Sequence, residues 1–362
     1  MPNTLPDNHH PAALIAAQSD QQAVLLWLSE FIERPATLRN YRKETERFLL
    51  WLADRNKGLQ AVQREDVLDY QRFLQAPWPA ERWIGPARPR QHAHWKPFTG
   101  PLKPASIRQA LTILSALFSY LGEAGYRHGN PFKLLRQRQP LDTRPVERFL
   151  DHAAWQAILS TLQQLPLDTH RERQQAARAR WLLTLLYLTG ARRQEVAAAR
   201  MGDISQRRQQ WWWRVYGKGG STADIPVSEE LLQALGDYRH SLGLSRFPLH
   251  GEGTPLLCRI PGQDNDSLHG VSDKAIYLIC REIFKRAADH CQDPQSRSQL
   301  LQASTHWLRH TAASHQLEAG VPLLMVSQNL RHASIQTTRR YLHSEDDARH
   351  EFSQLHRIAR PK

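Results

Sequence analysis

A polar, basic stretch interrupted twice by proline divides this 362-residue chain into two parts. It covers 136–145 and contains Pro140 and Pro145. Proline lacks the N–H that helices and sheets use, and a polar stretch has little surface to bury, so such a segment is typical of a linker. The predicted organisation is a mobile lead-in, a first domain, a linker, and a second domain that ends in a tail: 1–20, 21–139, 140–148 and 149–362, with the tail over 346–362.

The first domain is predicted to be all-helical. From Thr37, a good N-cap residue, the segment to Arg55 places its apolar side chains on one helical stripe. A second periodic segment begins near Ser106 and ends at a group of glycines followed by Pro131. Both patterns indicate amphipathic helices.

A proline- and tryptophan-rich insert over 80–107 separates these two helices. It contains a single acid, Glu81, and five basic residues: Arg82, Arg88, Arg90, Lys96 and Lys103. The insert is either a solvated loop that packs its tryptophans on its own domain or a basic arm that lies along a sugar-phosphate backbone. The local basic surplus favours the arm, and Arg39 and Lys43 of the preceding helix join the candidate DNA-contacting residues.

The second domain is predicted to be mainly helical with one β-hairpin. Periodic apolar patterns predict helices over 152–164, 174–189, 228–242, 271–289, 306–319 and 335–342. The strand-like segments 210–216 and 223–227 flank a glycine-rich turn that carries Lys218. The fold class is therefore mainly α with a small antiparallel sheet, an all-helical domain preceding a mixed α+β domain.

The net charge of +13 favours a polyanionic partner. Each lysine or arginine set against a phosphate releases condensed counterions, which drives binding to nucleic acid. An anionic membrane is the competing partner, but the chain lacks a basic amphipathic helix with an apolar face for insertion. Charge alone therefore favours DNA or RNA.

Other features of the sequence predict a cytoplasmic protein without a membrane segment. The longest apolar run, 181–188, is shorter than the roughly 18 residues that a membrane span needs, and the amino terminus does not resemble a signal peptide. Cys258, Cys280 and Cys291 are odd in number and have no C-x-x-C spacing. We expect reduced thiols and no metal ion or other cofactor.

The second domain carries side chains that suit cleavage of a phosphodiester without a metal. A tyrosine nucleophile needs its oxygen held in line, because phenol titrates near pH 10 and reacts poorly. Two guanidinium groups, from Arg192 and Arg309, can grip the phosphate oxygens and replace metal ions. His306 lies three residues before Arg309 and so shares its helix face, and Lys218 can protonate a leaving 5′ oxygen.

Each of these residues has a plainer interpretation when taken alone. His306 and His310 form half of a zinc-helix pattern, but Trp307 replaces the glutamate of H-E-x-x-H and no third ligand is evident. Lys218 alone would be an exposed turn lysine, and Tyr341 alone a half-buried core residue. The order and spacing of the whole set carry the prediction.

Taken in order, four boxes of this sequence resemble those of the tyrosine recombinase (phage integrase) family. The segment 189–195 resembles the box with the family's first catalytic arginine, and 217–219 resembles its hairpin lysine. The segments 306–310 and 330–341 resemble its H-x-x-R box and its terminal box of histidine and tyrosine. The amino-terminal helices, with Thr-Leu-x-x-Tyr at 37–41, are similar to its core-binding domain, so the resemblance covers most of the chain.

The resemblance implies a site-specific DNA recombinase that forms a 3′-phosphotyrosyl intermediate without ATP or a metal. The implied catalytic residues are Arg192, Lys218, His306, Arg309, His332 and the nucleophile Tyr341, with Glu195 as a brace for the arginine. Members of the family act as tetramers on two synapsed sites. The expected partners are therefore paired double-stranded DNA sites, other copies of this chain and an accessory DNA-binding protein, in the service of a mobile element, a plasmid or replicon resolution.

The sequence departs from the family's pattern at several positions. Arg193 replaces a small apolar residue after Arg192, although the spacing to the following glutamate favours Arg192 as the catalytic one. Arg331 stands where the family usually has glycine, which is expected to alter how His332 is presented. Asp224 stands where a basic residue often precedes the strand's Val-Pro, and the 80–107 insert is longer than usual.

Two other functions remain open at this point. A type IB topoisomerase would share the chemistry but relax supercoils without a paired site, and a non-catalytic DNA-binding factor would tolerate loss of Tyr341. The tail carries a narrow apolar stripe, Phe352, Leu355 and Ile358. The stripe would dock either on a neighbouring subunit or back on its own domain.

Overall fold

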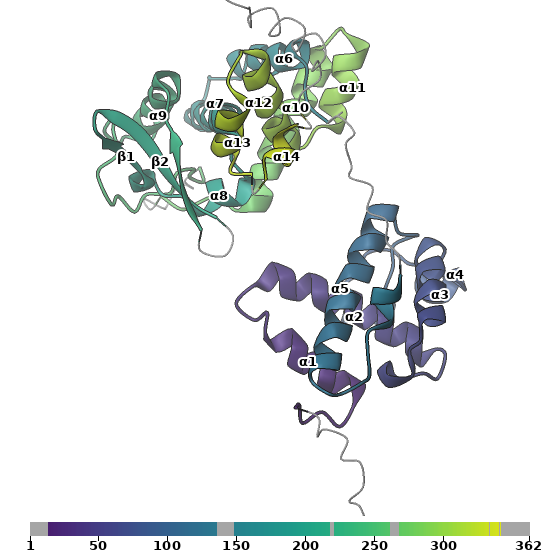
Figure 1. Ribbon diagram of the computed structural model, residues 1–362. Coiled ribbons are helices and arrows are strands. Elements are labelled where there is room, and N and C mark those ends of the chain that lie inside the picture. Colours follow the sequence, from purple (N-terminus) through teal and green to yellow (C-terminus); the bar gives the residue numbers. More distant parts are fainter. Residues whose placement is uncertain are drawn as a thin grey trace, which may run out of the picture. The chain divides into compact units, whose positions relative to one another are not determined.

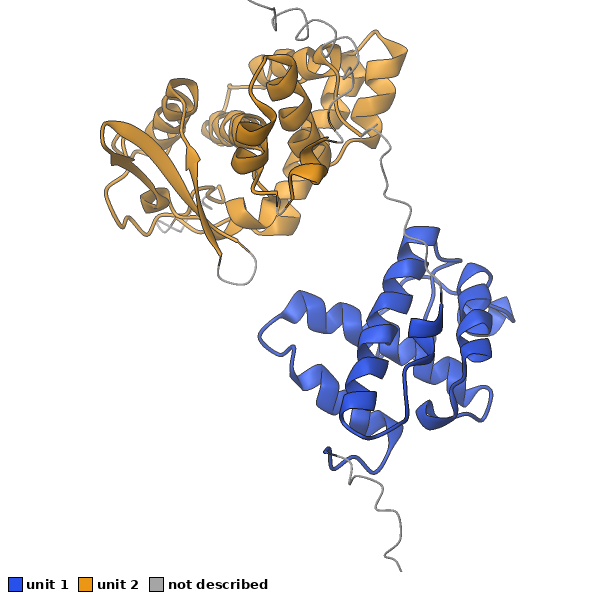
Figure 2. Cartoon of the chain, viewed as in Figure 1, with its two compact units in different colours: residues 1–140 blue, residues 141–362 orange. Residues whose placement is uncertain are grey.

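The computed structural model describes residues 14–135, 148–217, 221–260, 268–332, 334–339 and 341. The chain divides into two compact units, residues 1–140 and 141–362 (Figure 2). Each unit has a hydrophobic core of its own. Nearly all of the predicted linker, and the whole of the predicted tail, lie outside the described residues.

The first unit is all-helical in its described part, as the sequence predicts (Figure 1). Its helices are α1 Asp20–Ser29, α2 Pro35–Ala53, α3 Arg64–Gln75, α4 Ala80–Trp83 and α5 Pro104–Glu123, with short 3-10 turns at Leu59–Ala61 and Pro131–Leu134. The predicted start of α2 at Thr37 is wrong by two residues. Pro35 begins the helix, because its fixed φ suits the first turn and its missing N–H is not needed there.

Aromatic side chains fill the core of the first unit. Phe48 and Trp51 of α2 and Tyr70 of α3 are fully buried, and the ring of Tyr70 lies 4.8 Å from that of Phe48 and 5.0 Å from that of Trp51. The segment before α1, predicted as a mobile lead-in, is fixed from Leu14 onward. The Leu14 N–H donates to the Ala124 carbonyl at 2.8 Å, at the end of α5.

The second unit is mixed α and β. Its elements are α6 His152–Gln163, α7 His170–Thr189, α8 Arg193–Ala198, a 3-10 turn Met201–Asp203, β1 Ile204–Arg207, β2 Gln210–Tyr216, β3 Thr222–Pro226, α9 Glu229–Ser241, α10 Asp273–His290, α11 Pro294–Gln302, α12 Thr305–Glu318, α13 Leu323–Leu330 and α14 Ile335–Arg339. The predicted hairpin is confirmed, and β1 extends it to a three-stranded antiparallel sheet in the order β1-β2-β3. Among the described residues, no helix has the length and apolar character that a bilayer crossing requires.

Alternation along β2 explains how the sheet joins the core of this unit. Trp213 is fully buried and lies opposite Ile204 on β1 and Ile225 on β3, which are buried as well. On the sheet's exposed side, the carboxylate of Asp224 forms ion pairs with Arg207 at 2.8 Å and Arg214 at 3.4 Å. Asp224 therefore neutralises basic residues of its own sheet.

Candidate active site

The turn after α7 brings the first candidate arginine to the site. Gly190 has φ +57°, and a Cβ added there would lie 2.3 Å from a methyl carbon of Leu330, so glycine is needed for both backbone and space. The turn leads directly to Arg192, which precedes α8. The close contact between Gly190, at the end of α7, and Leu330, at the end of α13, therefore sets the position of the segment that carries Arg192.

Arg309, on α12, lies between these two helix ends. Its guanidinium donates to the Gly190 carbonyl at 2.6 Å and, through its other terminal nitrogen, to the Leu330 carbonyl. The residue is only 4 % exposed. A guanidinium has five N–H groups, so these two bonds leave others for a phosphate.

Several positive charges lie close together in the site, and a bound phosphate would reduce the repulsion between them. Burial, together with the charges of Arg192 and Arg331, lowers the pKa of Arg309 to about 9. The guanidinium is still charged at neutral pH but is destabilised by its neighbours. A bound phosphodiester would supply the opposite charge, so the geometry favours an anion at this place.

Glu195 bonds to two of the arginines. Its carboxylate accepts from the backbone N–H of Arg192 at 2.6 Å and from the guanidinium of the same residue at 2.9 Å. A third bond, at 2.7 Å, comes from Arg331. Burial would raise the pKa of Glu195, but Arg331 and Arg192 hold it below its usual value, so the carboxylate stays charged.

Arg193 has partners other than Glu195. Its Nε lies 3.2 Å from the carboxylate of Asp273, and its guanidinium lies over the ring of Tyr277 at 5.5 Å. Arg193 lines the same pocket as Arg192, His306 and Arg309, so the choice of Arg192 over Arg193 as the catalytic residue stays a prediction.

Arg331 occupies a backbone conformation that explains the glycine usual in the family. It ends α13 with φ 54° and ψ 47°, a left-handed conformation that costs a residue with a Cβ roughly 1–2 kcal/mol. Its largely buried side chain compensates by pairing with Glu195, itself buried. Compared with glycine, Arg331 gives up a relaxed backbone and gains an ion pair. The sequence shows this departure from the family's pattern, but only the structure explains it.

The two contributions of Arg331 can be separated by two substitutions. Both Arg331→Gly and Arg331→Ala remove the ion pair, but only alanine keeps the strained conformation. We therefore expect Arg331→Ala to be less stable than Arg331→Gly by about 1 kcal/mol in urea unfolding. Equal stabilities would show that the left-handed conformation is not maintained in the variants.

A pocket of about 360 Å³ opens beside the arginines. Arg192, His306 and Arg309 line it together with Tyr277 of α10. Burial and the charges of Arg309 and Arg192 lower the pKa of His306, so its imidazole is neutral at physiological pH. A neutral ring can donate one hydrogen bond to a phosphate and accept another.

Tyr341 lies against α12 and α13, 4 % exposed, with its ring in a small apolar cluster with Ala313, Val326 and Leu330. Its hydroxyl lies 2.5 Å from Nδ1 of His310. His310 in turn makes an edge-to-face contact with His306, with ring centroids 4.2 Å apart. From the sequence, His310 was part of a half zinc pattern and of the H-x-x-R box, and its contact with the tyrosine was not predicted.

His332 is on the other side of the tyrosine. Its ring is parallel to that of Tyr341, with centroids 6.1 Å apart, and its Nδ1 lies 2.7 Å from the hydroxyl of Thr338. Burial lowers the pKa of His332 to about 4, with a smaller contribution from the charges of Arg309, Arg192 and Arg331. His332 is therefore neutral over the whole physiological range.

This shift predicts how stability depends on pH. In the unfolded chain His332 takes up a proton near pH 6.5, whereas in the folded protein it does so only near pH 4. The unfolded state therefore binds more protons between these values, and stability falls as the pH drops from 6.5 towards 4. We expect the melting temperature to fall less steeply over this range in His332→Asn than in the wild type. Identical slopes in scanning calorimetry would contradict the shift.

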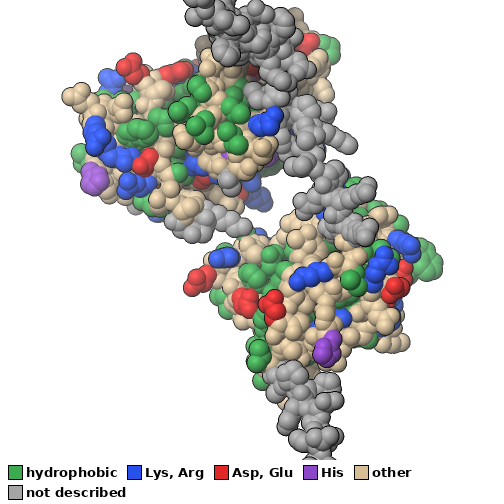
Figure 3. Space-filling view, in the orientation of Figure 1, with side chains coloured by type: hydrophobic (Ala, Val, Ile, Leu, Met, Phe, Trp, Pro, Cys, Tyr) green, Lys and Arg blue, Asp and Glu red, His purple; other side chains and the backbone are tan. Residues whose placement is uncertain are grey.

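The candidate DNA-contacting residues of the first unit are mostly exposed but engaged with their own unit. Arg82 pairs with Asp54 at 2.7 Å, and Arg90 pairs with Glu46 while its guanidinium lies 4.1 Å from the ring of Trp95. The other candidates are as follows: Arg88 bonds to His92, Lys96 bonds to the Glu81 carbonyl, Lys43 pairs with Glu44, Lys103 precedes α5 without a side-chain capping bond, and Arg39 is exposed on α2. On the face shown in Figure 3, basic and acidic side chains are mixed. A role in DNA contact stays a prediction.

Five of the six predicted catalytic residues come together in the second unit: Arg192, His306, Arg309, His332 and Tyr341. The sixth, Lys218, lies outside the described residues. The fold and this set of groups define an enzyme of the tyrosine recombinase class.

Comparison with known proteins supports the same class of enzyme. Residues 148–348 match the model of the phage integrase family, and the chain belongs to that family. It is 25 % identical over 328 residues to tyrosine recombinase XerC of Staphylococcus saprophyticus, covering 89 % of this chain and 92 % of that one. It is 27 % identical over 332 residues to tyrosine recombinase XerD of Yersinia pestis, covering 91 % and 94 %. The protein is thus a site-specific tyrosine recombinase, an enzyme of DNA strand exchange.

Solved structures show the same fold. The XerH site-specific recombinase, in a pre-cleavage complex with its difH substrate, matches with a TM-score of 0.62 at 16 % identity, over 94 % of this chain and 85 % of that one. The Tn1549 transposon integrase, in a complex with a circular intermediate DNA, matches with a TM-score of 0.59 at 16 % identity, over 94 % and 100 %.

Proposed function

We propose that the pocket beside the arginines binds the scissile phosphate of duplex DNA and that Tyr341 attacks it. The phenol oxygen forms a bond to phosphorus while the bond to the 5′ oxygen breaks, which gives a 3′-phosphotyrosyl link and a free 5′-hydroxyl. A 5′-hydroxyl of the partner strand then reverses the step. The observation that carries this proposal is the grouping of Arg192, Arg309 and two neutral histidines around the buried tyrosine.

The residues would have distinct roles in this reaction. Arg192 and Arg309 stabilise charge on the non-bridging oxygens, and Glu195 keeps Arg192 in place. His306 and His332 donate hydrogen bonds to the phosphate. His310 accepts the proton of the tyrosine hydroxyl, since its Nδ1 already lies 2.5 Å from that oxygen. Lys218, which lies between β2 and β3 in the sequence, protonates the leaving 5′ oxygen.

The proposed partners are paired double-stranded DNA sites and further copies of this chain, assembled as a tetramer, with an accessory DNA-binding protein. The net charge of +13 supports an acidic partner, and the XerH and Tn1549 enzymes were solved with DNA. Basic residues of the first unit would hold the duplex, as the core-binding domain of the family does. We place this reaction in the cytoplasm, where the thiols of three unpaired cysteines stay reduced, and propose that it serves a mobile element, a plasmid or the resolution of replicons.

Covalent trapping on DNA from the source genome and its plasmids tests the proposal. The protein is incubated without added metal, denatured, and the DNA that stays attached is sequenced. A small set of paired sites would support recombination. Scattered adducts would indicate relaxation of supercoils by the same chemistry, and tight binding without adducts would contradict the catalytic proposal.

A further inference from the structure

A cluster of metal-ligating side chains lies in the second unit, at the end of α12 opposite His306 and Arg309. His152, the first residue of α6, lies beside His315 and Glu318 near the end of α12. Each offers one ligand atom, and these atoms lie within 4.8 Å of one another. Within the described part of the chain, no other group of three or more histidine, cysteine or acidic residues is arranged in this way.

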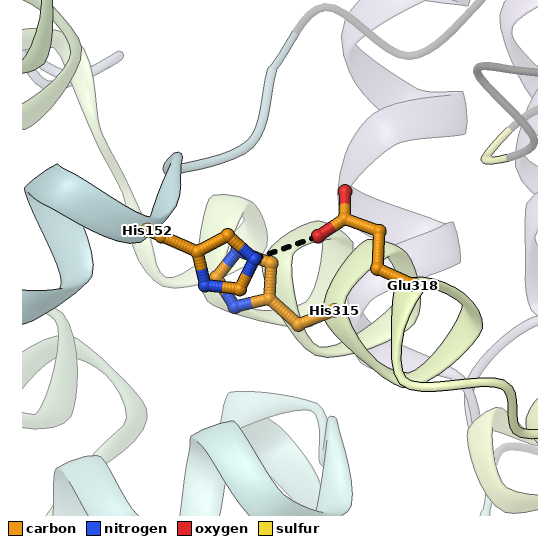
Figure 4. Close-up of side chains that lie close together, drawn as sticks. All are labelled: His152, His315 and Glu318. Carbon is orange, nitrogen blue, oxygen red and sulfur yellow. Dashed lines mark hydrogen bonds and ion pairs between the residues drawn. The ribbon is translucent and has the colours of Figure 1, made fainter.

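Two of the three side chains are already hydrogen-bonded to each other. Nε2 of His152 lies 2.8 Å from a carboxylate oxygen of Glu318, and Figure 4 shows this contact beside the His315 ring. The two imidazole rings are stacked, with centroids 4.0 Å apart and planes 11° apart. His152 and Glu318 are both exposed, so an ion from solvent can reach them.

The third side chain has a buried ring nitrogen that is poorly paired. His315 is 7 % exposed, and its Nε2 makes no hydrogen bond of good geometry, although the backbone of Leu150 interacts with the ring and raises its pKa. Such an atom costs about 1–3 kcal/mol when it stays unpaired, so native proteins rarely leave one. Because the His315 ring is buried, it cannot rotate to hydrogen-bond with solvent, whereas the exposed His152 ring can.

The environment of His315 prepares that nitrogen to bind a metal. Its Nδ1 lies 2.9 Å from the hydroxyl of Tyr187, which is itself held by stacking on Trp155 at 3.9 Å. A ligating histidine is usually oriented by such a bond from its other nitrogen, which leaves the lone pair on Nε2. Burial and the neighbouring His152 lower the pKa of His315, so it is neutral at pH 7.

We propose that His152, His315 and Glu318 form a Zn²⁺ site, with water as the fourth ligand. Two imidazole nitrogens and a carboxylate oxygen are ligands that Zn²⁺ binds at about 2.0–2.2 Å, which requires the atoms to lie about 3.3 Å apart. The exposed His152 ring would turn to reach this spacing, and the ion would replace the proton that His152 shares with Glu318. The site would join the start of α6 to the end of α12, the helix that carries His306 and Arg309.

Thermal denaturation of the untagged, full-length protein tests the site. After treatment with a chelator, Zn²⁺ is added and the melting temperature is recorded for the wild type, His152→Ala, Glu318→Gln and the control His240→Ala. His240 is an exposed helical histidine outside the cluster. These substitutions are at the surface, so all four proteins should fold, whereas a change at the buried His315 risks the fold itself.

Zinc is expected to raise the melting temperature of the wild type and of His240→Ala by roughly 5 °C at a free concentration about 100-fold above Kd. It should raise that of His152→Ala and Glu318→Gln by less than half as much. Co²⁺ should give the visible absorption of a tetrahedral nitrogen and oxygen site in the first pair only. No shift in the wild type, or the same shift in all four proteins, would overturn the proposal and leave a plain ion pair of His152 and Glu318.

Discussion

Replacing Tyr341 with phenylalanine is expected to abolish covalent attachment to DNA, with a fall in cleavage rate on the order of 10⁴-fold or more. The substitution removes only the oxygen that we propose attacks phosphorus. The ring stays in its cluster with Ala313 and Leu330, and one hydrogen bond to His310 is lost, so the free energy of unfolding should fall by about 1 kcal/mol at most. Single-turnover cleavage of a nicked site, followed by denaturing electrophoresis, measures the rate.

Tyr277 offers a matched control for this experiment. It lines the same pocket as Arg192 and is the same residue type. Tyr277→Phe should leave the adduct intact. If Tyr277→Phe instead removes the adduct while Tyr341→Phe keeps it, the nucleophile has been assigned to the wrong side of the arginines.

Replacing Arg309 with lysine is expected to damage both activity and stability. A lysine cannot bond to the Gly190 and Leu330 carbonyls and also grip two oxygens of a phosphate, because its ammonium is a single point charge. Loss of an arginine that stabilises a phosphoryl transition state costs about 10³–10⁵-fold in rate. Leaving a buried carbonyl unpaired costs about 1–3 kcal/mol, which urea unfolding will detect.

Arg192→Lys separates these two effects. The side chain of Arg192 is 49 % exposed and bonds to the carboxylate of Glu195, a contact that a lysine can retain. We expect a comparable loss of cleavage rate with a change in unfolding free energy below about 1 kcal/mol. A large loss of stability in Arg192→Lys would contradict the division of roles between the two arginines.

Helical periodicity predicted the long helices of both units, and the turn chemistry predicted the hairpin. The sequence patterns did not predict α3 and α13, and the packing of these helices has consequences. Tyr70 of α3 completes the aromatic core of the first unit, and α13 carries the carbonyl that holds Arg309. Short helices present only two or three turns of pattern, so their apolar residues are easily assigned to loops.

The order of the boxes in the sequence predicted a set of catalytic residues, but it did not predict which side chains of different boxes are in contact. His310 on α12 and Tyr341 after α14 are 31 residues apart in the sequence, and it is the tertiary fold that brings the ring nitrogen to the hydroxyl. The charge of the 80–107 insert was likewise misjudged because its ion-pair partners are distant in sequence. Counting residues over 80–107 finds one acid, whereas the partners of Arg82 and Arg90 lie on or just after α2, far away in sequence.

Arg309 also closes two helices at their carboxyl ends. The last carbonyls of a helix have no partner within it, and here one side chain caps both α7 and α13. Selection for a folded chain alone would therefore preserve this arginine in a descendant that no longer cuts DNA. Arg192 is the N-cap residue of α8, but its backbone N–H makes the capping bond to Glu195, so its half-exposed side chain would be freer to change in such a descendant. Between the two, it is Arg192 whose retention in a related sequence is evidence of a working enzyme.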